Sequence, residues 1–507
     1  MTSAWDYHNR TSYDRRDMKG GYLDWSSQPG VFKSYPGRSP APLPRDTLLT
    51  TESVQSILAV GNCESDASPI NLNRLGKILY LTHTLTAKAR VSGGDFYYRS
   101  VASAGALYPF ELYVAALTVA DLKAGIYHHD ILNNGLTLLR NGISATELIQ
   151  GLGFSRDNLP AVVFFLTAII FRSSWKYRDR AYRYLLLDTG HMAENLSLAL
   201  RSERLRFRVF YDFEDQAVND LLAIDSNREV CLAAVCVWAG DGVLKDGPGL
   251  EPSQPDLSAY SKVSDGERDY PIIREIHAAS SYVPKNNNQR PPFRSQFGLA
   301  VDSWKELPDT LEPPDILSYP EAVQKRRSMR NYISREMPEQ RFSALLRGVC
   351  SDIHLTVIME SSIPDCIGIG LLIGNIVGWT PGFYLLDRTR RAIGLVREGF
   401  MMDEMAHVCL DQAWLANCSV HIVFLADFNE MEETGGARFY RHAMMNAGRL
   451  GQRIYLLATS MRIGCCGIGA FYDAEAAMLL GLTGRNRMLY LVGAGVVKKW
   501  AIWNDRL

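Results

Sequence analysis

The 507-residue sequence has almost no net charge, with 54 Lys and Arg residues against 55 Asp and Glu residues. It therefore lacks an overall field that would hold nucleic acid or an anionic membrane, and we expect neither as a partner. The longest apolar run, Ala161 to Phe171, is about half the length needed to span a bilayer. Because the first residues also lack the apolar run of a signal peptide, we expect a cytoplasmic protein.

Motifs for metals, disulfides and nucleoside triphosphates are also missing. The nine cysteines include no Cys-x-x-Cys pair, and the ten histidines show no paired spacing that would hold a metal. Cys465 and Cys466 are sequence neighbours, which would strain a disulfide between them, so we expect reduced thiols. With no Walker loop and no Gly-x-Gly-x-x-Gly after a strand, a nucleoside triphosphate is not expected as a ligand.

What the sequence does contain is a duplication with an almost constant offset. Residues that match 258 positions apart are Arg180 to Arg183 with Arg438 to Arg441, Gly190 with Gly448, and Phe213 and Asp215 with Phe471 and Asp473. Small, aromatic and charged residues that recur at one spacing are hard to obtain by chance. The chain is therefore predicted to be two copies of one unit.

The length suits two α+β units of about 200 residues each, with extensions. We predict an N-terminal wrapping segment at residues 1–68, a first repeat at 69–246, a linker at 247–314 and a second repeat at 315–507. The unbroken apolar run Val162 to Ala168 predicts a strand covered on both faces. Apolar residues at helical spacing predict long helices at Tyr182–Ser202 and Arg438–Met461, which we expect to pack across a pseudo-two-fold interface.

Arg326-Arg327-Ser328-Met329-Arg330 is the first of three motifs that could carry chemistry, and we expect it just ahead of or on the first turns of a helix. Arginine binds a phosphate monoester bidentately and serine adds a neutral donor, so the cluster suits a phosphate. A solvated basic face is an equal alternative.

The other two motifs are small and contain glycine. Ser103-Ala104-Gly105 leads into the predicted strand Glu111 to Leu117, and a loop without bulky side chains lets backbone amides approach a flat ring. Gly467-Ile468-Gly469 follows the second long helix and could present an amide to a redox-active ring nitrogen. Taken alone, the first could be a tight turn and the second a helix C-cap.

Together with the repeat, these motifs resemble the nitroreductase superfamily, and more narrowly the SagB-type dehydrogenases that oxidise azolines in ribosomal peptide natural products. Tyr7 to Thr11, Leu23-Asp24-Trp25 and Tyr182 to His191 are similar to that group. The resemblance implies a tandem α+β fold of nitroreductase-like repeats that form an intramolecular pseudo-dimer and bind FMN. The implied FMN contacts are Arg326, Arg327, Ser328, Arg330, Gly467, Ile468 and Gly469 from one half, and Ser103, Ala104 and Gly105 from the other.

Compared with that pattern, the two halves have lost complementary parts. The second repeat has Glu360-Ser361-Ser362 where its Ser-Ala-Gly loop should stand. The phosphate position of the first repeat falls at Ala59 to Cys63, and its N5 position at the glycine-free Arg206-Phe207-Arg208. We therefore predict one composite FMN site. Two sites are the alternative, if Arg10 and Ser12 supply a second phosphate contact.

Lys176-Tyr177 is similar to the pair to which azoline dehydrogenases assign proton abstraction. Oxidation of a thiazoline removes a proton and a hydride, so a base must stand opposite the flavin N5. A desolvated lysine near other cations could have a pKa close to neutral, although a surface lysine beside a packed tyrosine is the alternative. The other repeat has Thr434 and Gly435 at these positions, so only one half could perform this step.

The sequence thus predicts an FMN-dependent oxidoreductase, most closely a dehydrogenase of an azoline or similar small heterocycle, with dioxygen as the final oxidant. Expected partners are a small-molecule or modified-peptide substrate and a cyclodehydratase complex, with the chain as a monomer or a homodimer. Two alternatives stay open: a general NAD(P)H-dependent nitro or quinone reductase, and a non-catalytic peptide-binding scaffold.

Overall fold

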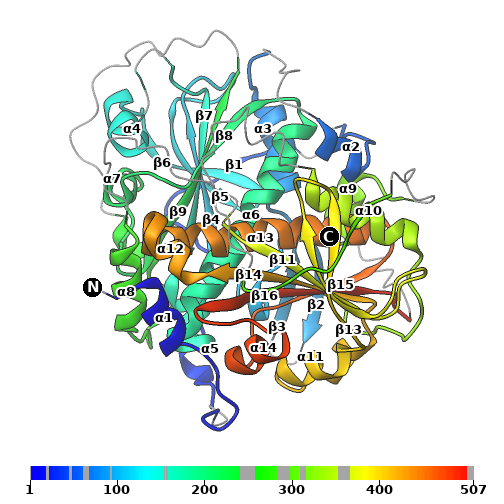
Figure 1. The fold of residues 1–507 in the computed structure, drawn as a ribbon. Helices are drawn as coiled ribbons and strands as arrows, with labels where there is room; N and C mark the ends of the chain where they lie inside the picture. The colour runs from blue at the N-terminus through cyan, green and yellow to red at the C-terminus, as the bar shows by residue number, and fades with distance from the viewer. Residues whose placement is uncertain are drawn as a thin grey trace.

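The computed structural model describes residues 2–18, 22–44, 48–60, 68–91, 94–153, 155, 158–239, 257–281, 297–308, 316–351 and 366–498. These residues form two seven-stranded antiparallel sheets, with two long helices between them (Figure 1). The strand order of one sheet is that of the other, position for position. The predicted α+β fold with tandem repeats is confirmed.

The first sheet has the order β1-β6-β5-β4-β7-β9-β8. Its strands are β1 (Ala41–Pro42), β4 (Phe110–Ala116), β5 (Gly125–Asp130), β6 (Gly135–Asn141), β7 (Val162–Ile169), β8 (Arg206–Phe210) and β9 (Glu229–Trp238). All eight residues of β7 are buried, because apolar clusters cover both faces of the sheet. The predicted strand at Val162 to Ala168 is confirmed.

The second sheet has the order β10-β13-β12-β11-β14-β16-β15. Its strands are β10 (Trp304–Glu306), β11 (Gly368–Ile373), β12 (Gly382–Asp387), β13 (Ala392–Glu398), β14 (Val420–Asp427), β15 (Gly464–Ile468) and β16 (Asn486–Gly495). Strand β14 is central here, as β7 is in the first sheet. A separate hairpin, β2 (Leu85–Val91) with β3 (Gly94–Arg99), belongs to the first half of the chain.

The shorter helices lie around the two sheets (Figure 1). They are α1 (Ala4–Arg10), α2 (Val54–Ala59), α3 (Leu72–Thr82), α4 (Ala145–Leu152), α5 (Ile170–Tyr177), α7 (Asp215–Leu221), α8 (Pro271–Ala279), α9 (Tyr319–Lys325), α10 (Glu339–Cys350), α11 (Met402–Val408), α12 (Phe428–Gly435) and α14 (Asp473–Leu479). Short 3-10 helices are η1 (Trp25–Ser27), η2 (Ala104–Ala106), η3 (Arg178–Arg180), η4 (Ser258–Ser261) and η5 (Ala413–Asn417).

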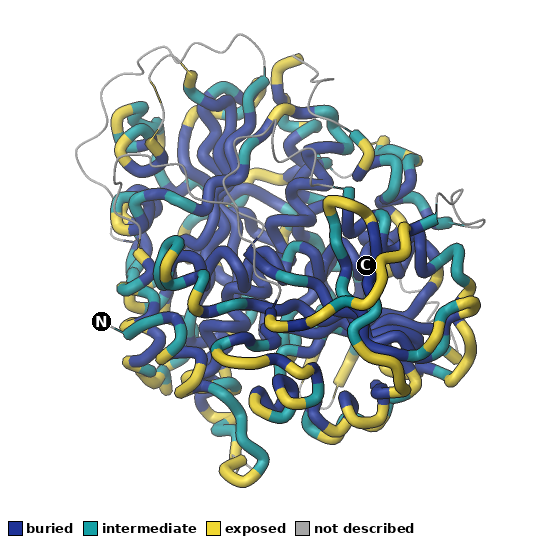
Figure 2. Tube along the Cα trace, viewed as in Figure 1, coloured by how far each residue is buried: buried dark blue, intermediate teal, exposed yellow. Residues whose placement is uncertain are grey.

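The two predicted long helices, α6 (Ala181–Ser202) and α13 (Ala437–Ser460), pack against each other in the buried centre of the molecule (Figure 2). A Cβ atom on Gly190 would lie 2.1 Å from the carbonyl oxygen of Met445, and one on Gly448 would lie 2.1 Å from that of Leu187. Each helix therefore needs its glycine for the other to approach. This reciprocity gives the interface its pseudo-two-fold character, as predicted.

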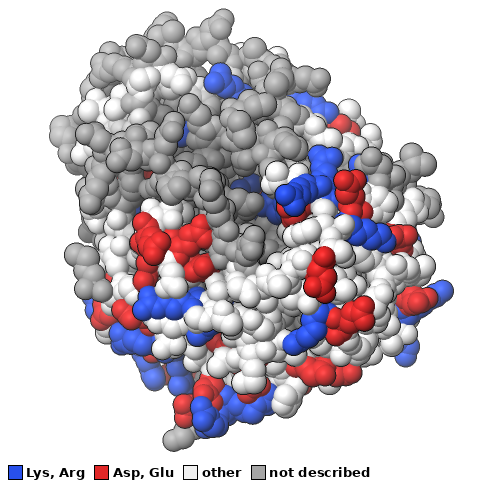
Figure 3. Space-filling view, in the orientation of Figure 1, with Lys and Arg blue, Asp and Glu red and all other residues white. Residues whose placement is uncertain are grey.

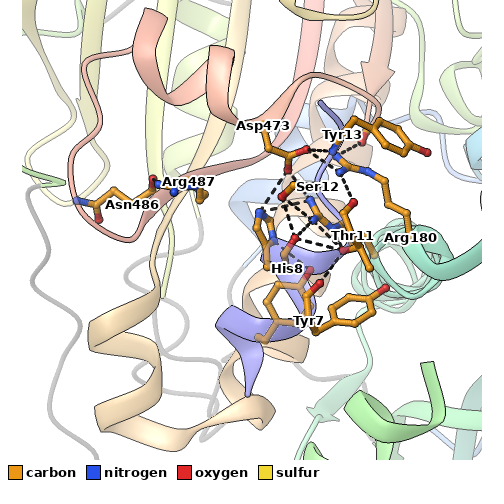
Figure 4. Close-up of polar contacts among 12 residues, drawn as sticks. Tyr7, His8, Thr11, Ser12, Tyr13, Arg180, Asp473, Asn486 and Arg487 are labelled. Atoms are coloured by element: carbon orange, nitrogen blue, oxygen red, sulfur yellow. Dashed lines mark hydrogen bonds and ion pairs between the residues drawn. The ribbon is translucent and has the colours of Figure 1, made fainter. Parts of the chain in front are cut away.

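Buried ion pairs repeat the same relationship. Arg180, at the start of α6, lies 2.7 Å from the carboxylate of Asp473 in the other repeat (Figure 4). Arg183 lies 2.7 Å from the other oxygen of the same carboxylate. Arg438 and Arg441, at the start of α13, each lie 2.6 Å from the carboxylate of Asp215 in the first repeat. Burial alone would raise the pKa of Asp473, but Arg180 and Arg183 hold it well below its usual range. Each pair joins one repeat to the other.

Helices α1 and α8 cap these ion pairs in equivalent ways. The ring of His8 in α1 is 3.3 Å from the hydroxyl of Tyr440, and the ring of His277 in α8 is 3.2 Å from that of Tyr182. Arg183 donates to the carbonyl of His8, and its counterpart Arg441 donates to that of Ser280. The interval predicted as a linker thus contains α8 and the sheet strand β10, while the domain boundaries themselves stay predictions.

In the part of the chain that the structure describes, no helix is both long and apolar enough to cross a bilayer. Acidic and basic side chains are mixed over the described part of the face shown in Figure 3. This mixture agrees with the near-zero net charge of the sequence.

Candidate functional site

The predicted phosphate cluster directly follows α9, so the expected position at the start of a helix is corrected. The Nε atom of Arg326 donates to the carbonyl of Ser100 at 2.7 Å, and Nη2 donates to that of Arg99 at 2.8 Å. Arg327 donates across the interface to the carbonyl of Thr86 at 3.3 Å. The second repeat thus sets its arginines against the chain of the first repeat, just ahead of Ser103.

No carboxylate pairs with Arg326, Arg327 or Arg330 among the described residues. Burial, and then the neighbouring Arg326, lowers the pKa of Arg327 to about 10. The Nε atom of Arg327 is buried and has no hydrogen-bond partner in the described part of the chain, whereas Ser328 and Arg330 are exposed. Clustered guanidinium groups without a counter-ion are typical of an anion site.

The loop Ser103-Ala104-Gly105 lies against Asp188 of α6. Ser103 donates its hydroxyl to a carboxylate oxygen of Asp188 at 2.6 Å, and the Ala104 amide donates to the other oxygen at 3.2 Å. Gly105 is exposed and has a φ of +63°, a left-handed conformation that side chains rarely adopt. The loop therefore keeps its accessible glycine in a fixed position.

Lys176 and Tyr177, the last residues of α5, pack on this loop. A Cβ atom on Gly105 would lie 2.7 Å from the Tyr177 hydroxyl and 3.2 Å from Nζ of Lys176. Lys176 is exposed, but desolvation by its neighbours, and then the charge of Arg330, lowers its pKa. Burial, and then the charge of Asp188, raises the pKa of Tyr177. The structure therefore brings the Lys-Tyr pair, the small loop and the arginine cluster close together.

The segment Gly467-Ile468-Gly469, at the end of β15, closes the group. Tyr184 packs its ring on Tyr177, with 4.2 Å between ring centroids, and donates its hydroxyl to the carbonyl of Gly469 at 3.1 Å. The Gly467 amide donates to the hydroxyl of Tyr455 at 2.7 Å, and this hydroxyl is 2.8 Å from that of Ser328. The Gly467 amide is therefore occupied within the fold.

The equivalent position in the other half is built differently. Arg180 donates to the carbonyl of Gly469, and its counterpart Arg438 donates to that of Tyr211. The residues equivalent to Gly467 to Gly469 are thus Val209 to Tyr211, three positions later than the Arg206 to Arg208 of the sequence prediction. They are again glycine-free, and the buried Tyr211 stands in place of Gly469.

The other predicted differences between the two repeats lie partly outside the described residues. Helix α12 ends in Thr434 and Gly435, as α5 ends in Lys176 and Tyr177. Glu360-Ser361-Ser362 and residues 61–63 of the predicted phosphate position lie outside the described residues. Arg10 is exposed beside Glu275, and the Ser12 hydroxyl donates to the carbonyl of His8. Both residues therefore make their contacts at the α1–α8 corner, and a second phosphate site gains no support from them.

Sequence reasoning gave no site role to Asp188, Tyr184 or Tyr455, which connect the predicted residues to one another, although the first two lie in the Tyr182 to His191 motif. A signal was present for Asp188, because the residue 258 positions later is Asn446, so the two long helices differ at an otherwise matched place. For the two tyrosines the signal was only an aromatic residue at helical spacing, which equally fits a core position.

A model of the Nitroreductase family matches residues 46–240 and 383–496, more than half of the chain. A Methanocaldococcus jannaschii protein named as a nitroreductase is 27% identical over 192 residues, 36% of this chain and 97% of that protein. Trifolitoxin-processing protein TfxB of Rhizobium leguminosarum is 26% identical over 262 residues, 47% of this chain and 70% of TfxB. Microcin B17-processing protein McbC of Escherichia coli is 29% identical over 133 residues, 25% of this chain and 49% of McbC.

The crystal structure of an Anabaena variabilis protein, also named as a nitroreductase, is similar over nearly the full length. It is 24% identical and covers 98% of this chain and 100% of its own, with a TM-score of 0.78. The whole two-repeat fold therefore occurs in another protein.

Proposed function

Because the chain belongs to the nitroreductase family and is an oxidoreductase of that superfamily, we propose that it is an FMN-dependent dehydrogenase of the SagB type. Its substrate in this proposal is an azoline-like or other small heterocycle, whose hydride passes to flavin N5. Similarity to proteins that process trifolitoxin and microcin B17 supports a modified peptide as the carrier of that ring. An azoline is made by cyclodehydration, so a cyclodehydratase would act before this enzyme.

The residues at the site fit FMN. Arg327, Ser328 and Arg330 would hold the phosphate, because this cluster has no carboxylate partner in the described part of the chain and the buried Nε of Arg327 lacks an acceptor. Ser103 to Gly105 and Gly467 to Gly469 would lie along the ring, since both segments keep accessible backbone. Arg326 would act mainly by fastening the cluster to Arg99 and Ser100. Bound FMN supplies the hydride acceptor.

Lys176 takes the ring proton in this proposal. Its lowered pKa, due to desolvation by its neighbours and to Arg330, favours the neutral amine that can act as a base. Tyr177 stays protonated, because burial and Asp188 raise its pKa, so its hydroxyl orients the substrate or relays the proton. The ring of Tyr184 packs on that of Tyr177, and its hydroxyl donates to the carbonyl of Gly469, so Tyr184 connects Tyr177 to the end of β15.

One observation carries the proposal: Lys176 and Tyr177 of the first repeat meet Gly105, and through Tyr184 they meet Gly469 of the second repeat. A base at this place is needed for dehydrogenation of a heterocycle, whereas a general nitro or quinone reductase does not need it, since only a hydride moves from NADPH.

Anaerobic stopped flow separates the two reactions. With an azoline-bearing peptide, Lys176→Ala and Tyr177→Phe should reduce the rate of flavin reduction by about 10² or more, the usual scale of general base catalysis. With NADPH, the same variants should change little, and Thr434→Ala, at the matched position of the other repeat, should change neither rate. Peptide-driven reduction that survives both substitutions would refute the assignment, and reduction by NADPH alone would favour the general reductase.

A further inference from the structure

Asp188 has no role in the function proposed so far, although it is buried beside the site. It lies on α6 with 3% of its surface exposed, and both of its oxygens accept hydrogen bonds from the Ser103 loop. Ser103 in turn accepts from the amide of Tyr108 at 2.9 Å. The carboxylate thus holds both the start of the loop and, through Ser103, its end.

The loop needs such a hold because its backbone is strained. Gly105, Ala106 and Tyr108 have φ values of +63°, +54° and +46°. For Ala106 and Tyr108 this left-handed conformation is unfavourable and persists only where the surroundings impose it. Asp188 accepts hydrogen bonds from the Ala104 amide of the loop and from the Ser103 side chain, so these contacts act directly on the conformation of the loop backbone.

The other repeat offers an independent observation. The position of Asp188 on α6 is taken on α13 by Asn446, which is also buried. The carboxylate therefore stands only in the half that has the Ser-Ala-Gly loop and the Lys-Tyr pair. A residue needed for the helix interface would be expected in both halves, as Gly190 and Gly448 are.

We propose that Asp188 is a positioning residue which, as a carboxylate, clamps the Ser103-Ala104-Gly105 loop in its left-handed conformation beneath Lys176 and Tyr177. The consequence for FMN rests on the proposed function, whereas the clamp itself does not. Two donors, the Ser103 hydroxyl and the Ala104 amide, point at the carboxylate. Protonation would place a third hydrogen in the same contact, so the ionised form suits the clamp.

The ionised form is unfavourable for folding. Burial raises the pKa of Asp188 to about 7, although Ser103 and Ala104 oppose the shift. The titratable groups that face it are Tyr177 of α5 and Tyr490 of β16, with Lys176 and Arg330 as the cations nearest to Tyr177. Since the folded-state pKa is above that of the unfolded chain, stability is lost as the pH rises from about 4 to about 7. Asp188 therefore holds the loop at the expense of stability.

Three variants test the clamp: Asp188→Leu removes both acceptors, Asp188→Asn keeps an acceptor but no charge, and Asn446→Leu is the matched control on α13. Without FMN, backbone amides of residues 103–108 should exchange with deuterium at least tenfold faster in Asp188→Leu than in Asn446→Leu. Equal exchange in these two variants would overturn the proposal, whatever the protein's function.

Thermal unfolding tests the charge. Asp188→Asn should unfold at a higher temperature than the wild type at pH 8, and the gain should shrink at pH 5, where the wild-type carboxyl is protonated. If Asp188 only stabilised the fold, Asp188→Asn would unfold at a lower temperature than the wild type at pH 8. That result would refute the proposal that Asp188 is buried as an ionised carboxylate.

FMN titration connects the clamp to the site. At pH 8, Asp188→Leu should bind FMN at least tenfold more weakly and Asp188→Asn should also bind it more weakly than the wild type, because its amide replaces one of the two acceptor oxygens, while Asn446→Leu stays within about threefold of the wild type. Wild-type protein that binds no FMN would refute the proposed function, and deuterium exchange and unfolding would still decide the role of Asp188. Wild-type affinity in Asp188→Leu would show that the loop does not contact FMN.

Discussion

The two repeats are alike where they hold each other and different where chemistry is proposed. Gly190 and Gly448, and the carboxylates of Asp215 and Asp473, occupy equivalent places in the interface. Lys176 and Asp188, in contrast, are replaced by Thr434 and Asn446 at the matched positions of the other repeat. A fused pseudo-dimer needs both copies of its interface, because each half covers the core of the other. It needs only one copy of a site built from both halves.

The largest effect is expected at the helix crossing. Gly190→Ala or Gly448→Ala would place a Cβ atom 2.1 Å from an opposing carbonyl oxygen, and because backbone must move, each should lower the free energy of unfolding by more than about 4 kcal/mol. Urea denaturation followed by circular dichroism measures this. Gly30→Ala, whose Cβ would lie an ordinary 3.7 Å from its nearest atom, is the control. A large effect at only one of the two glycines would break the symmetry of the interface.

The next effect concerns the buried ion pairs. Asp473→Ala leaves the buried Arg180 and Arg183 without their carboxylate, whereas Asp215→Ala does so for Arg441 and leaves Arg438 with Asp212 at 3.4 Å. Each substitution should reduce stability by about 3–5 kcal/mol, with Asp215→Ala at the lower end. The same urea experiment applies, with the exposed Asp265→Ala as the control. If one variant were as stable as the wild type, its arginines would have another acceptor and the two ends of the interface would not be equivalent.

A smaller effect sharpens the contrast between the halves. Arg327→Ala should remove a charge-assisted bond to the FMN phosphate, worth about 1.5–3 kcal/mol, and weaken FMN at least tenfold in a fluorescence titration. Arg208→Ala, at the glycine-free edge strand of the first repeat, should leave the affinity unchanged. Arg326→Ala is a poorer probe, because Arg326 also bonds the carbonyls of Arg99 and Ser100. Equal FMN affinity in all of these variants would show that the arginine cluster is a solvated basic surface and not a phosphate site.

The smallest effect is expected for the FMN content, which should stay the same. Acid release should yield about one FMN per chain, and Tyr211→Gly should not add a second, because the first repeat has Ala59 to Cys63 where the second repeat has its arginine cluster. Two equivalents in the wild type would contradict the single composite site, and a second equivalent in Tyr211→Gly would show that Tyr211 alone closes the other position.

Local patterns were enough to predict the two long helices, the buried strand at Val162 and the duplication. Periodicity predicted the long helices and the buried strand at Val162, because burial on one stripe or on both faces leaves a direct trace in the sequence. The motif at Arg326 was recognised, but its place after α9 was not, since short helices have weak signals. The edge strand was misaligned by three residues, because β8 and β15 share almost no residue types beyond their position in the sheet.

The sequence by itself determined that the chain is a tandem duplication and which half carries each unusual residue. Only the tertiary structure decided that Lys176 and Asp188, on the consecutive helices α5 and α6, meet the loop at Gly105 and the end of β15 at Gly469, which lie elsewhere along the chain. The order of the residues along the chain does not specify such contacts. They arise because α6 and α13 cross at their glycines and carry the two halves of the site to the same side of the interface.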